Sequence, residues 1–431
     1  MKIPVCTSLI LLILSLPAIA AETDPEEIPT APYPAEKADM EHYSDTLFGD
    51  WRGRRSAMFA KGYDLQVVYK LDLLNNTAVE RERIYGLDNL DIKLKLDFEK
   101  ITGGKDTTAF LHVISNRGDK PGAHSDRLPH GVDNIETPAN GNTTKIFQAW
   151  LQETFLDGRV SVLGGLYDLN AEFYTTESAA MFMHPTFGMS AELAGTGKNG
   201  PSVFPTSSIA LRVKTEPAPG YYVQAITLDG VPGDPNNPQG THIKFDEGDG
   251  ALNVIEGGIP LGLPKNAHNN KLAFGVWQYT TRFDDILDVD ASGKPVQRVS
   301  SGAYAMLEKV LKYKAGSHEE QISGFFRIGR TEGDTSQFDL ALSAGLVFAA
   351  VFPGREQDEL GIAYAQERNS DKYRIASGNT VYSEKSFELG YRYRALPGFT
   401  VQPFVQYLQN HSKDITQDKT WWLGMRTEAA F

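Results

Sequence analysis

Hydrophobic and polar residues alternate along most of the chain. In residues 63–72 every second residue is apolar or aromatic, and most of the residues between them are charged or carry an amide. Residues 387–394 repeat the pattern, with Phe387 and Leu389 in the apolar set and Arg392 in the polar set. A period of two places successive side chains on opposite faces of the backbone. These segments therefore predict strands with one apolar and one polar face.

About 16 segments have this character. They lie at residues 63–72, 90–98, 107–114, 145–155, 159–167, 207–214, 220–228, 250–259, 271–280, 303–313, 320–328, 338–348, 358–366, 385–394, 400–408 and 421–431. Long connections (115–144, 168–206, 229–249, 281–302 and 367–384) alternate with tight turns such as residues 156–158. A soluble β-sandwich gives no reason for this alternation of loop lengths. The pattern predicts an all-β transmembrane barrel of the bacterial outer membrane, with short periplasmic turns and long extracellular loops.

The last segment shows which face meets lipid. Counting back from Phe431 places Trp421, Leu423 and Met425 on one face and Arg426 on the other. An arginine facing lipid costs up to about 2–4 kcal/mol near the bilayer midplane, so the charged face is assigned to a water-filled interior. A final aromatic residue on such a strand resembles the signal read by the barrel assembly machinery, which is therefore an expected partner.

The N-terminus resembles an export signal. Lys2 precedes an apolar run from Leu9 to Leu16, and residues 18–20 offer small residues for cleavage. We expect residues 1–20 to be a signal peptide and residues 21–46 an acidic, proline-rich flexible leader. The barrel domain then spans 47–431 and begins with a short helix capped by Asp50.

Composition narrows the function. The net charge is −13 and no basic stretch occurs, which argues against nucleic acid as a partner. The only cysteine lies in the signal peptide, so thiol chemistry is unavailable to the mature chain. Mean hydropathy is only −0.33 although the chain has 40 Gly, 22 Phe and 18 Tyr. A barrel explains this combination, because only alternate residues face lipid.

Several spaced motifs resemble the carbohydrate-selective porins of the OprB type. They are Phe48-Gly49-Asp50-Trp51-Arg52-Gly53, Gln148-Ala149-Trp150-Leu151, Phe155-Leu156-Asp157-Gly158-Arg159, Gly165-Leu166-Tyr167-Asp168-Leu169-Asn170 with Glu172-Phe173, Phe187-Gly188, residues 228–235 and residues 247–250. The resemblance extends from about Leu47 to Phe431. It implies a monomeric barrel of about 16 strands that passes monosaccharides such as glucose by passive diffusion.

Candidate pore residues follow from strand parity and from the family motif. The inward-facing candidates are Lys93, Lys95, Arg212, Arg327, Glu388, Arg392 and Arg426, with Trp150 as an aromatic wall for a sugar ring. Asp168, Asn170 and Glu172 match the family motif at the base of the long 168–206 connection, where the resemblance implies a constriction. This connection is too apolar to stand in water. We expect it to fold into the barrel; covering the mouth is the alternative.

Other functions remain as alternatives. A general or ion-selective diffusion porin would have the same strand pattern. A barrel enzyme or surface-binding protein would need serine, histidine and acid clustered at one rim, which the sequence lacks, so no catalytic residue and no cofactor is expected. The acidic residues Asp284, Asp285, Asp288 and Asp290 are interpreted as a solvated loop near lipopolysaccharide, with a divalent-cation site as the alternative.

Overall fold

Sixteen antiparallel strands form a closed barrel. The computed structural model describes Tyr43 and residues 45–77, 84–104, 106–121, 131–136, 142–262, 270–314, 319–409 and 419–431. Each strand pairs with the next along the chain, and the last strand pairs with the first. The strands are β1 (Tyr63–Asn76), β2 (Ile84–Asp97), β3 (Thr107–Gly118), β4 (Thr143–Phe155), β5 (Val160–Tyr167), β6 (Ser208–Ala218), β7 (Tyr221–Asp229), β8 (Ala251–Pro260), β9 (Lys271–Val289), β10 (Pro295–Tyr313), β11 (Glu320–Thr331), β12 (Phe338–Ala349), β13 (Glu359–Asn369), β14 (Ser383–Leu396), β15 (Phe399–Gln409) and β16 (Lys419–Ala430). The predicted fold class is confirmed.

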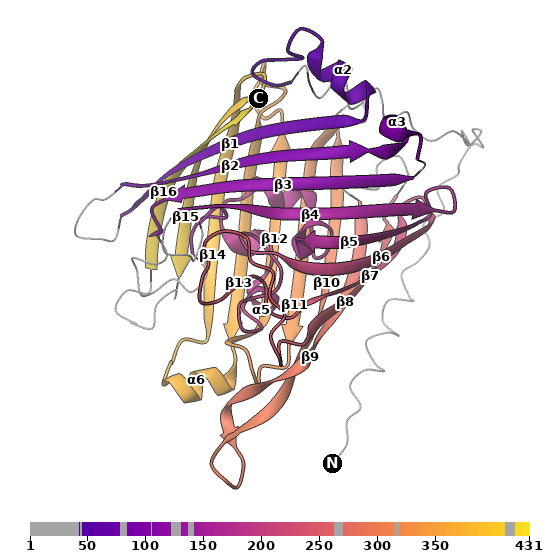
Figure 1. Cartoon of the computed structure of the whole chain (residues 1–431). Helices are drawn as coiled ribbons and strands as arrows, with labels where there is room; N and C mark the ends of the chain where they lie inside the picture. Colours follow the sequence, from indigo (N-terminus) through magenta and orange to yellow (C-terminus); the bar gives the residue numbers. More distant parts are fainter. Residues whose placement is uncertain are drawn as a thin grey trace, which may run out of the picture. The chain divides into compact units, whose positions relative to one another are not determined.

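Three of the helices lie at the two ends of the barrel. Figure 1 shows α2 (Arg54–Ala60) and α3 (Phe98–Thr102) at one end, and α6 (Asp371–Ser377) with the tip of the β9–β10 hairpin at the other. In the part of the chain that is described, no helix is both long and apolar enough to cross a membrane. The expected signal peptide and most of the expected leader lie outside the described residues.

The prediction of a long loop at 281–302 is wrong. β9 continues to Val289 and β10 begins at Pro295, so the hairpin ends in a tight turn in which Asp290 N–H donates to the Lys294 carbonyl at 2.8 Å. The hairpin tip projects from the barrel end that carries α6 (Figure 1). Most side chains of residues 282–299 are exposed or half-buried, so these parts of the strands lack the apolar alternation by which a sequence reveals a membrane strand.

The outer face of the barrel is apolar, as the register predicts. Trp421 and Leu423 are each 51% exposed, whereas Arg426 on the opposite face of β16 is buried. Four aromatic rings form a row across β13 to β16, with neighbouring ring centroids 4.6 to 6.3 Å apart. They belong to Tyr364, Phe387, Tyr407 and Trp421. Such rows mark the boundary between lipid and water in membrane barrels.

Glycines on the inner face make room for aromatic rings on neighbouring strands. A Cβ added to Gly424 would lie 2.1 Å from Phe404, and one added to Gly275 would lie 2.1 Å from Tyr304. The same relation holds for Gly258 with Tyr222, Gly302 with Trp277 and Gly345 with Phe325. A ring that lies flat over a glycine covers the backbone that a missing side chain leaves bare. These five pairs therefore explain part of the high glycine and aromatic content.

These pairs predict the outcome of adding a single methyl group. Gly424→Ala should destabilise the barrel by about 1–3 kcal/mol, because Phe404 must leave its position. The measurement is the temperature at which the barrel loses its compact mobility on a gel. Gly164→Ala is the control, since a Cβ at the exposed Gly164 meets nothing within 4 Å. Equal transition temperatures for the two variants would contradict this packing.

The segment before β1 closes the seam between the first and last strands. Arg55 in α2 is 3% exposed, and its guanidinium donates to the carbonyls of Leu65 and Phe431, each at 2.9 Å. Leu47 N–H donates to the Ala430 carbonyl at 2.8 Å. The predicted cap is wrong: the helix begins after Gly53, and Asp50 accepts bonds from Ser56 instead.

Candidate functional site: an inward-folded constriction

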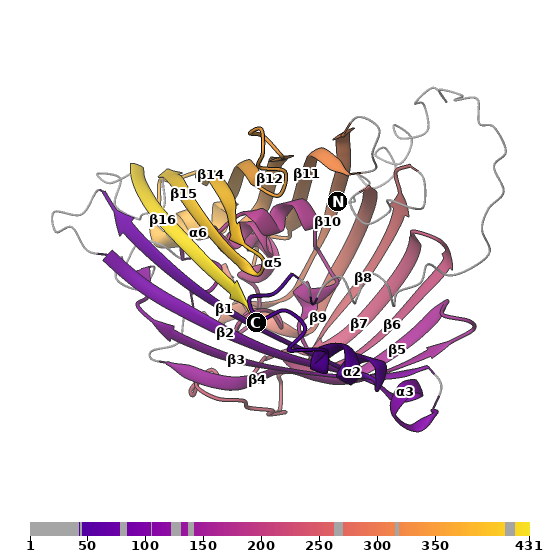
Figure 2. The same cartoon turned by 90° about the horizontal axis from the view of Figure 1, so that it is seen from above.

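The connection between β5 and β6 fills much of the barrel interior. We call residues 168–207 the inner loop; Figure 2 shows its helix α5 (Ala191–Ala194) inside the ring of strands. It also contains the short 3-10 helices η1 (Leu169–Ala171), η2 (Glu177–Met181) and η3 (Pro185–Phe187). Its apolar side chains pack on the inner wall, where the ring of Tyr174 stacks on that of Tyr304 with centroids 4.0 Å apart. Inward folding is confirmed.

Wall carboxylates hold the backbone of the inner loop. Glu388 in β14 accepts the N–H groups of Met183 and His184 at 2.6 and 2.9 Å. Glu308 in β10 accepts the N–H of Ser178 at 2.6 Å, and its other oxygen accepts the N–H of Glu177 at 3.0 Å. Buried carboxylates that accept backbone N–H groups make strong, charge-assisted bonds. Two neighbouring N–H groups of the loop are thus fixed at each of these wall positions.

Wall cations and amides hold the carbonyls of the same loop. Arg327 in β11 is fully buried and donates to the carbonyls of Thr186 and Gly188 at 2.8 and 2.7 Å. Further along the wall, Gln402 donates to the Met181 carbonyl at 2.7 Å. The wall therefore holds the inner loop through its backbone as well as through its packed side chains.

Arg426 fixes a second segment inside the barrel. Its guanidinium contacts the carboxylates of Asp72 in β1 and Asp133 at 2.5 and 3.1 Å, and the side-chain oxygen of Asn134 at 2.7 Å. Asp133 and Asn134 belong to residues 131–136, which we call the second inner segment. This segment also donates to the inner loop, from Asn134 N–H to the Met183 carbonyl at 2.8 Å. The two segments thus form one constriction.

A cavity of about 410 Å³ lies between this constriction and the wall. Its two sides differ in chemistry. The inner loop contributes a mainly apolar side with Ala180, Met183, Pro185, Met189, Ala194, Val203 and Phe204. The wall contributes a polar side with Lys70, Asn89, Asp91, Arg392, Thr400, Gln402, Arg426 and Glu428. Its volume falls within the range of about 300–1,000 Å³ that is usual for small-molecule sites.

The structure separates the predicted site residues into two groups. Arg392 and Arg426 line the cavity, and so does Asn170 of the family motif. Arg327 and Glu388 are buried behind the inner loop, as the preceding contacts show. The prediction that inward charges face water is therefore wrong for these two residues. Their hydrogen-bond partners are backbone groups of the inner loop, not water.

The remaining predicted residues lie outside the cavity lining. Arg212 is buried and pairs with Glu172 at 2.9 Å, and Asp168 caps η1 by accepting the N–H of Asn170 at 3.0 Å. Lys93 is half-buried and Lys95 is exposed. All of these lie at the wall or at the base of the inner loop.

The aromatic residue in the cavity wall is Phe204, which the sequence reading missed. Trp150 instead stacks on Phe110, with centroids 5.1 Å apart, and donates to Gln148 at 3.3 Å. Phe204 lies in the inner loop, where no strand parity exists to indicate which way a side chain points. The position of a ring in a loop depends on the folded loop alone.

A buried carboxyl of the inner loop packs closely against β11. Glu192 in α5 is fully buried and accepts a hydrogen bond from the Tyr174 hydroxyl at 2.8 Å. Burial raises the pKa of Glu192 to about 7. A Cβ added to Gly329 would lie 1.7 Å from the Glu192 carboxyl. The loop can approach β11 so closely only because residue 329 has no side chain.

The acidic rim residues are held by cations from other elements. Asp285 is 4% exposed and contacts Lys372 of α6 and Arg298 of β10 at 2.5 and 2.9 Å. Asp288 contacts the same two cations at 2.8 and 3.1 Å, and Asp334 also contacts Lys372. These ion pairs join the β9–β10 hairpin to α6. The interpretation of a simply solvated loop is therefore corrected for Asp285 and Asp288.

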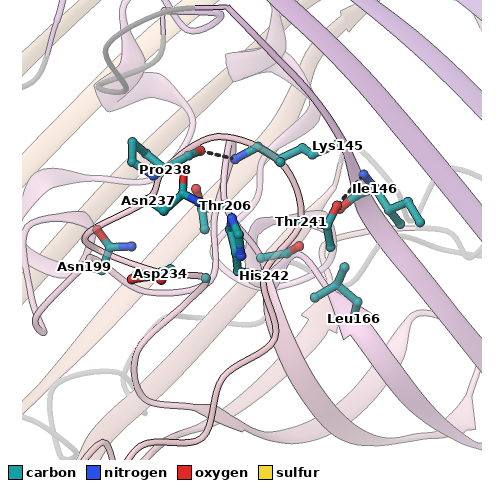
Figure 3. A pocket seen from close by; sticks show the side chains of 13 residues that line it. Lys145, Ile146, Leu166, Asn199, Thr206, Asp234, Asn237, Pro238, Thr241 and His242 are labelled. Carbon is teal, nitrogen blue, oxygen red and sulfur yellow. Dashed lines mark hydrogen bonds between the residues drawn. The ribbon is translucent and has the colours of Figure 1, made fainter.

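Another pocket lies beneath the connection between β7 and β8 (Figure 3). In this view Lys145 donates to the Pro238 carbonyl at 3.1 Å, and the Thr241 hydroxyl accepts the N–H of Ile146 at 2.7 Å. Thr241 thereby caps the edge of β4 beyond its pairing with β5, which begins at Ala149. The pocket measures about 20 Å³, which is room for a single water molecule.

A closed barrel with an apolar exterior and an inward-folded constriction defines an outer-membrane porin. The family model "Carbohydrate-selective porin, OprB family" matches residues 81–431. Porin B of Pseudomonas aeruginosa is 23% identical over 432 residues, which cover 90% of this chain and 92% of that protein. This chain belongs to the carbohydrate-selective porin family, OprB type.

Solved structures agree with this assignment at the level of the fold. The high-pH structure of Pseudomonas putida OprB superposes with a TM-score of 0.76 at 19% identity and covers 90% of this chain and 98% of that one. The low-pH structure of the same protein has a TM-score of 0.58 at 19% identity and covers 90% and 99%. The chain is a porin of the bacterial outer membrane, and its fold is that of a channel.

Proposed function

We propose that monosaccharides cross the outer membrane through the cavity beside the inner loop. The observation that carries this proposal is the difference between the two sides of the cavity. An apolar side formed by the inner loop faces a wall of amides and charged groups. A sugar has weakly apolar ring faces and a rim of hydroxyls, so it can pack on the first side while its hydroxyls bond to the second.

A sugar that crosses the pore should bind the cavity wall only weakly. Each hydroxyl both donates and accepts, so it can exchange partners along a wall that mixes amide, carboxylate and guanidinium groups. Permeation requires that binding favour entry and still permit release. The family assignment supports carbohydrate as the solute class. The mixed wall supports exchange of hydroxyl partners, in contrast to a single tight site.

The test is swelling of liposomes that contain the purified porin. Glucose and other monosaccharides should enter faster than amino acids of similar size. Equal rates for sugars and those amino acids would overturn the proposed preference, and an absence of swelling would overturn the function as a diffusion pore.

A single ring should measurably affect sugar binding. Phe204→Ala should weaken the block of single-channel current by glucose about two- to ten-fold, because the apolar side loses its aromatic contact. Phe326→Ala is the matched control, since this ring is 40% exposed on the outer face of β11. An unchanged block in Phe204→Ala would show that the sugar does not contact this side.

A further inference from the structure

We propose that this pore discriminates among sugars by charge, admitting neutral and amino sugars and retarding sugar acids, and that Glu428 is the residue responsible. The discrimination among sugars rests on the proposed function. The expected preference for cations over anions does not depend on it. The carrying observation is an imbalance among the charged groups of the cavity: each cation in its lining has an acidic partner at ion-pair distance, whereas one carboxylate has no cation at that distance.

The three cations of the cavity lining are each paired. Lys70 lies 3.8 Å from the Asp91 carboxylate. Arg392 lies 2.8 Å from the carboxylate of Glu359. Arg426 is paired with two carboxylates and is buried, as described above. A carboxylate or phosphate on a solute would therefore find no unpaired cation in this lining and would meet the partner acids as well.

Glu428 differs from the other charged groups of the lining. Within the described residues its carboxylate has neither a hydrogen bond nor a cation at ion-pair distance, and the side chain is half-buried beside the cavity. It lies on β16 directly across from Lys70 on β1 and from Thr400 on β15. Lys70 already contacts Asp91, so one ammonium is shared between two acidic neighbours. Arg426 also interacts electrostatically with Glu428, but its guanidinium is already paired with Asp72 and Asp133 at 2.5 and 3.1 Å. Glu428 thus adds a negative charge to a lining whose cations already have acidic partners.

Two further lysines occur on the inner face of β2, outside the cavity lining. Lys93 interacts electrostatically with Asp168 at the base of the inner loop. Lys95 is exposed and lies across from Asp64 in the pairing of β1 with β2. Both lysines therefore have an acid nearby, and neither reverses the excess of acid at the cavity.

The consequence follows from electrostatics in a narrow passage. Low-dielectric walls concentrate the field of a fixed charge, so a single unpaired carboxylate raises the local concentration of cations and lowers that of anions. Its oxygens also accept hydrogen bonds from hydroxyl or ammonium groups, which neutral and amino sugars supply. A sugar acid has the same ring and size as its neutral counterpart, but its carboxylate is repelled by Glu428.

The first test is the reversal potential of the purified full barrel in a planar bilayer under a potassium chloride gradient. The wild type should pass potassium in preference to chloride. Glu428→Gln should lower the permeability ratio by about two- to five-fold, the effect of one partly solvated charge at short range. Glu428→Lys should make the pore prefer chloride. Glu99→Gln is the control, because Glu99 is exposed in α3, outside the cavity lining.

The second test compares glucosamine, glucose and glucuronate at neutral pH in liposome swelling. The wild type should admit the first two faster than glucuronate, and Glu428→Gln should narrow that difference. Heat-dependent gel mobility confirms that each variant is folded. Equal rates for glucose and glucuronate, or an ion selectivity that Glu428→Gln leaves unchanged, would overturn the proposal. Ion selectivity that depends on Glu428, without entry of any sugar, would support charge discrimination while refuting the proposed function.

Discussion

Arg327→Ala is expected to release the inner loop from β11 and to raise the single-channel conductance several-fold while abolishing sugar block. The substitution leaves the carbonyls of Thr186 and Gly188 without their donor. Each buried carbonyl that loses its partner costs about 1–3 kcal/mol unless it reaches water, so the loop should move to where water can solvate it. Because Gly188 lines the cavity, this movement widens the passage directly. Single-channel recording with glucose titration measures both effects.

Two further variants test whether the changes in conductance and sugar block come from losing the bonds between Arg327 and the inner loop. Arg330→Ala removes the same side chain three positions away in β11, where it is exposed, and should leave conductance and block unchanged. Arg327→Lys keeps the charge but lacks the planar fork that reaches two carbonyls, so it should give an intermediate conductance. A wild-type conductance and block in Arg327→Ala would refute the anchoring role.

Arg426→Ala is expected to give the largest loss of stability among single substitutions in the constriction. It would leave the buried carboxylates of Asp72 and Asp133 without their cation. Removing one partner of a buried ion pair costs about 3–5 kcal/mol, because the remaining charge has neither water nor a counter-charge. The second inner segment should detach as well. Heat-dependent gel mobility should therefore show a much lower transition temperature, and conductance should rise.

The control for Arg426 is an ion pair at the surface. Arg374 and Asp371 in α6 lie 2.6 Å apart, and the side chain of Asp371 is 81% exposed. Arg374→Ala should change stability by less than about 1 kcal/mol, because solvent already screens the pair. A transition temperature for Arg426→Ala as high as that of Arg374→Ala would show that the acidic residues find other partners.

Strand parity predicted which face each side chain occupies, but it did not predict contacts. Arg327 and Glu388 do point inward, as their positions in alternating segments indicate. Their partners, however, lie 139 to 205 residues away in the inner loop. Those partners are backbone groups, which every residue possesses. A sequence therefore contains no signal that would identify them.

The sequence by itself determined the barrel, the approximate number of strands and the division into lipid-facing and inward-facing residues. These features depend on the pleat, which repeats every two residues and is encoded in neighbouring positions. Only the tertiary structure decided that inward charges such as Arg426 hold folded segments, that Phe204 lies in the passage where Trp150 was expected, and that Glu428 has no cation at ion-pair distance among the described residues. These outcomes depend on how a long loop crosses the barrel and meets strands far away in the chain. Local periodicity does not encode such a path, because it describes only the direction in which a side chain leaves its own strand.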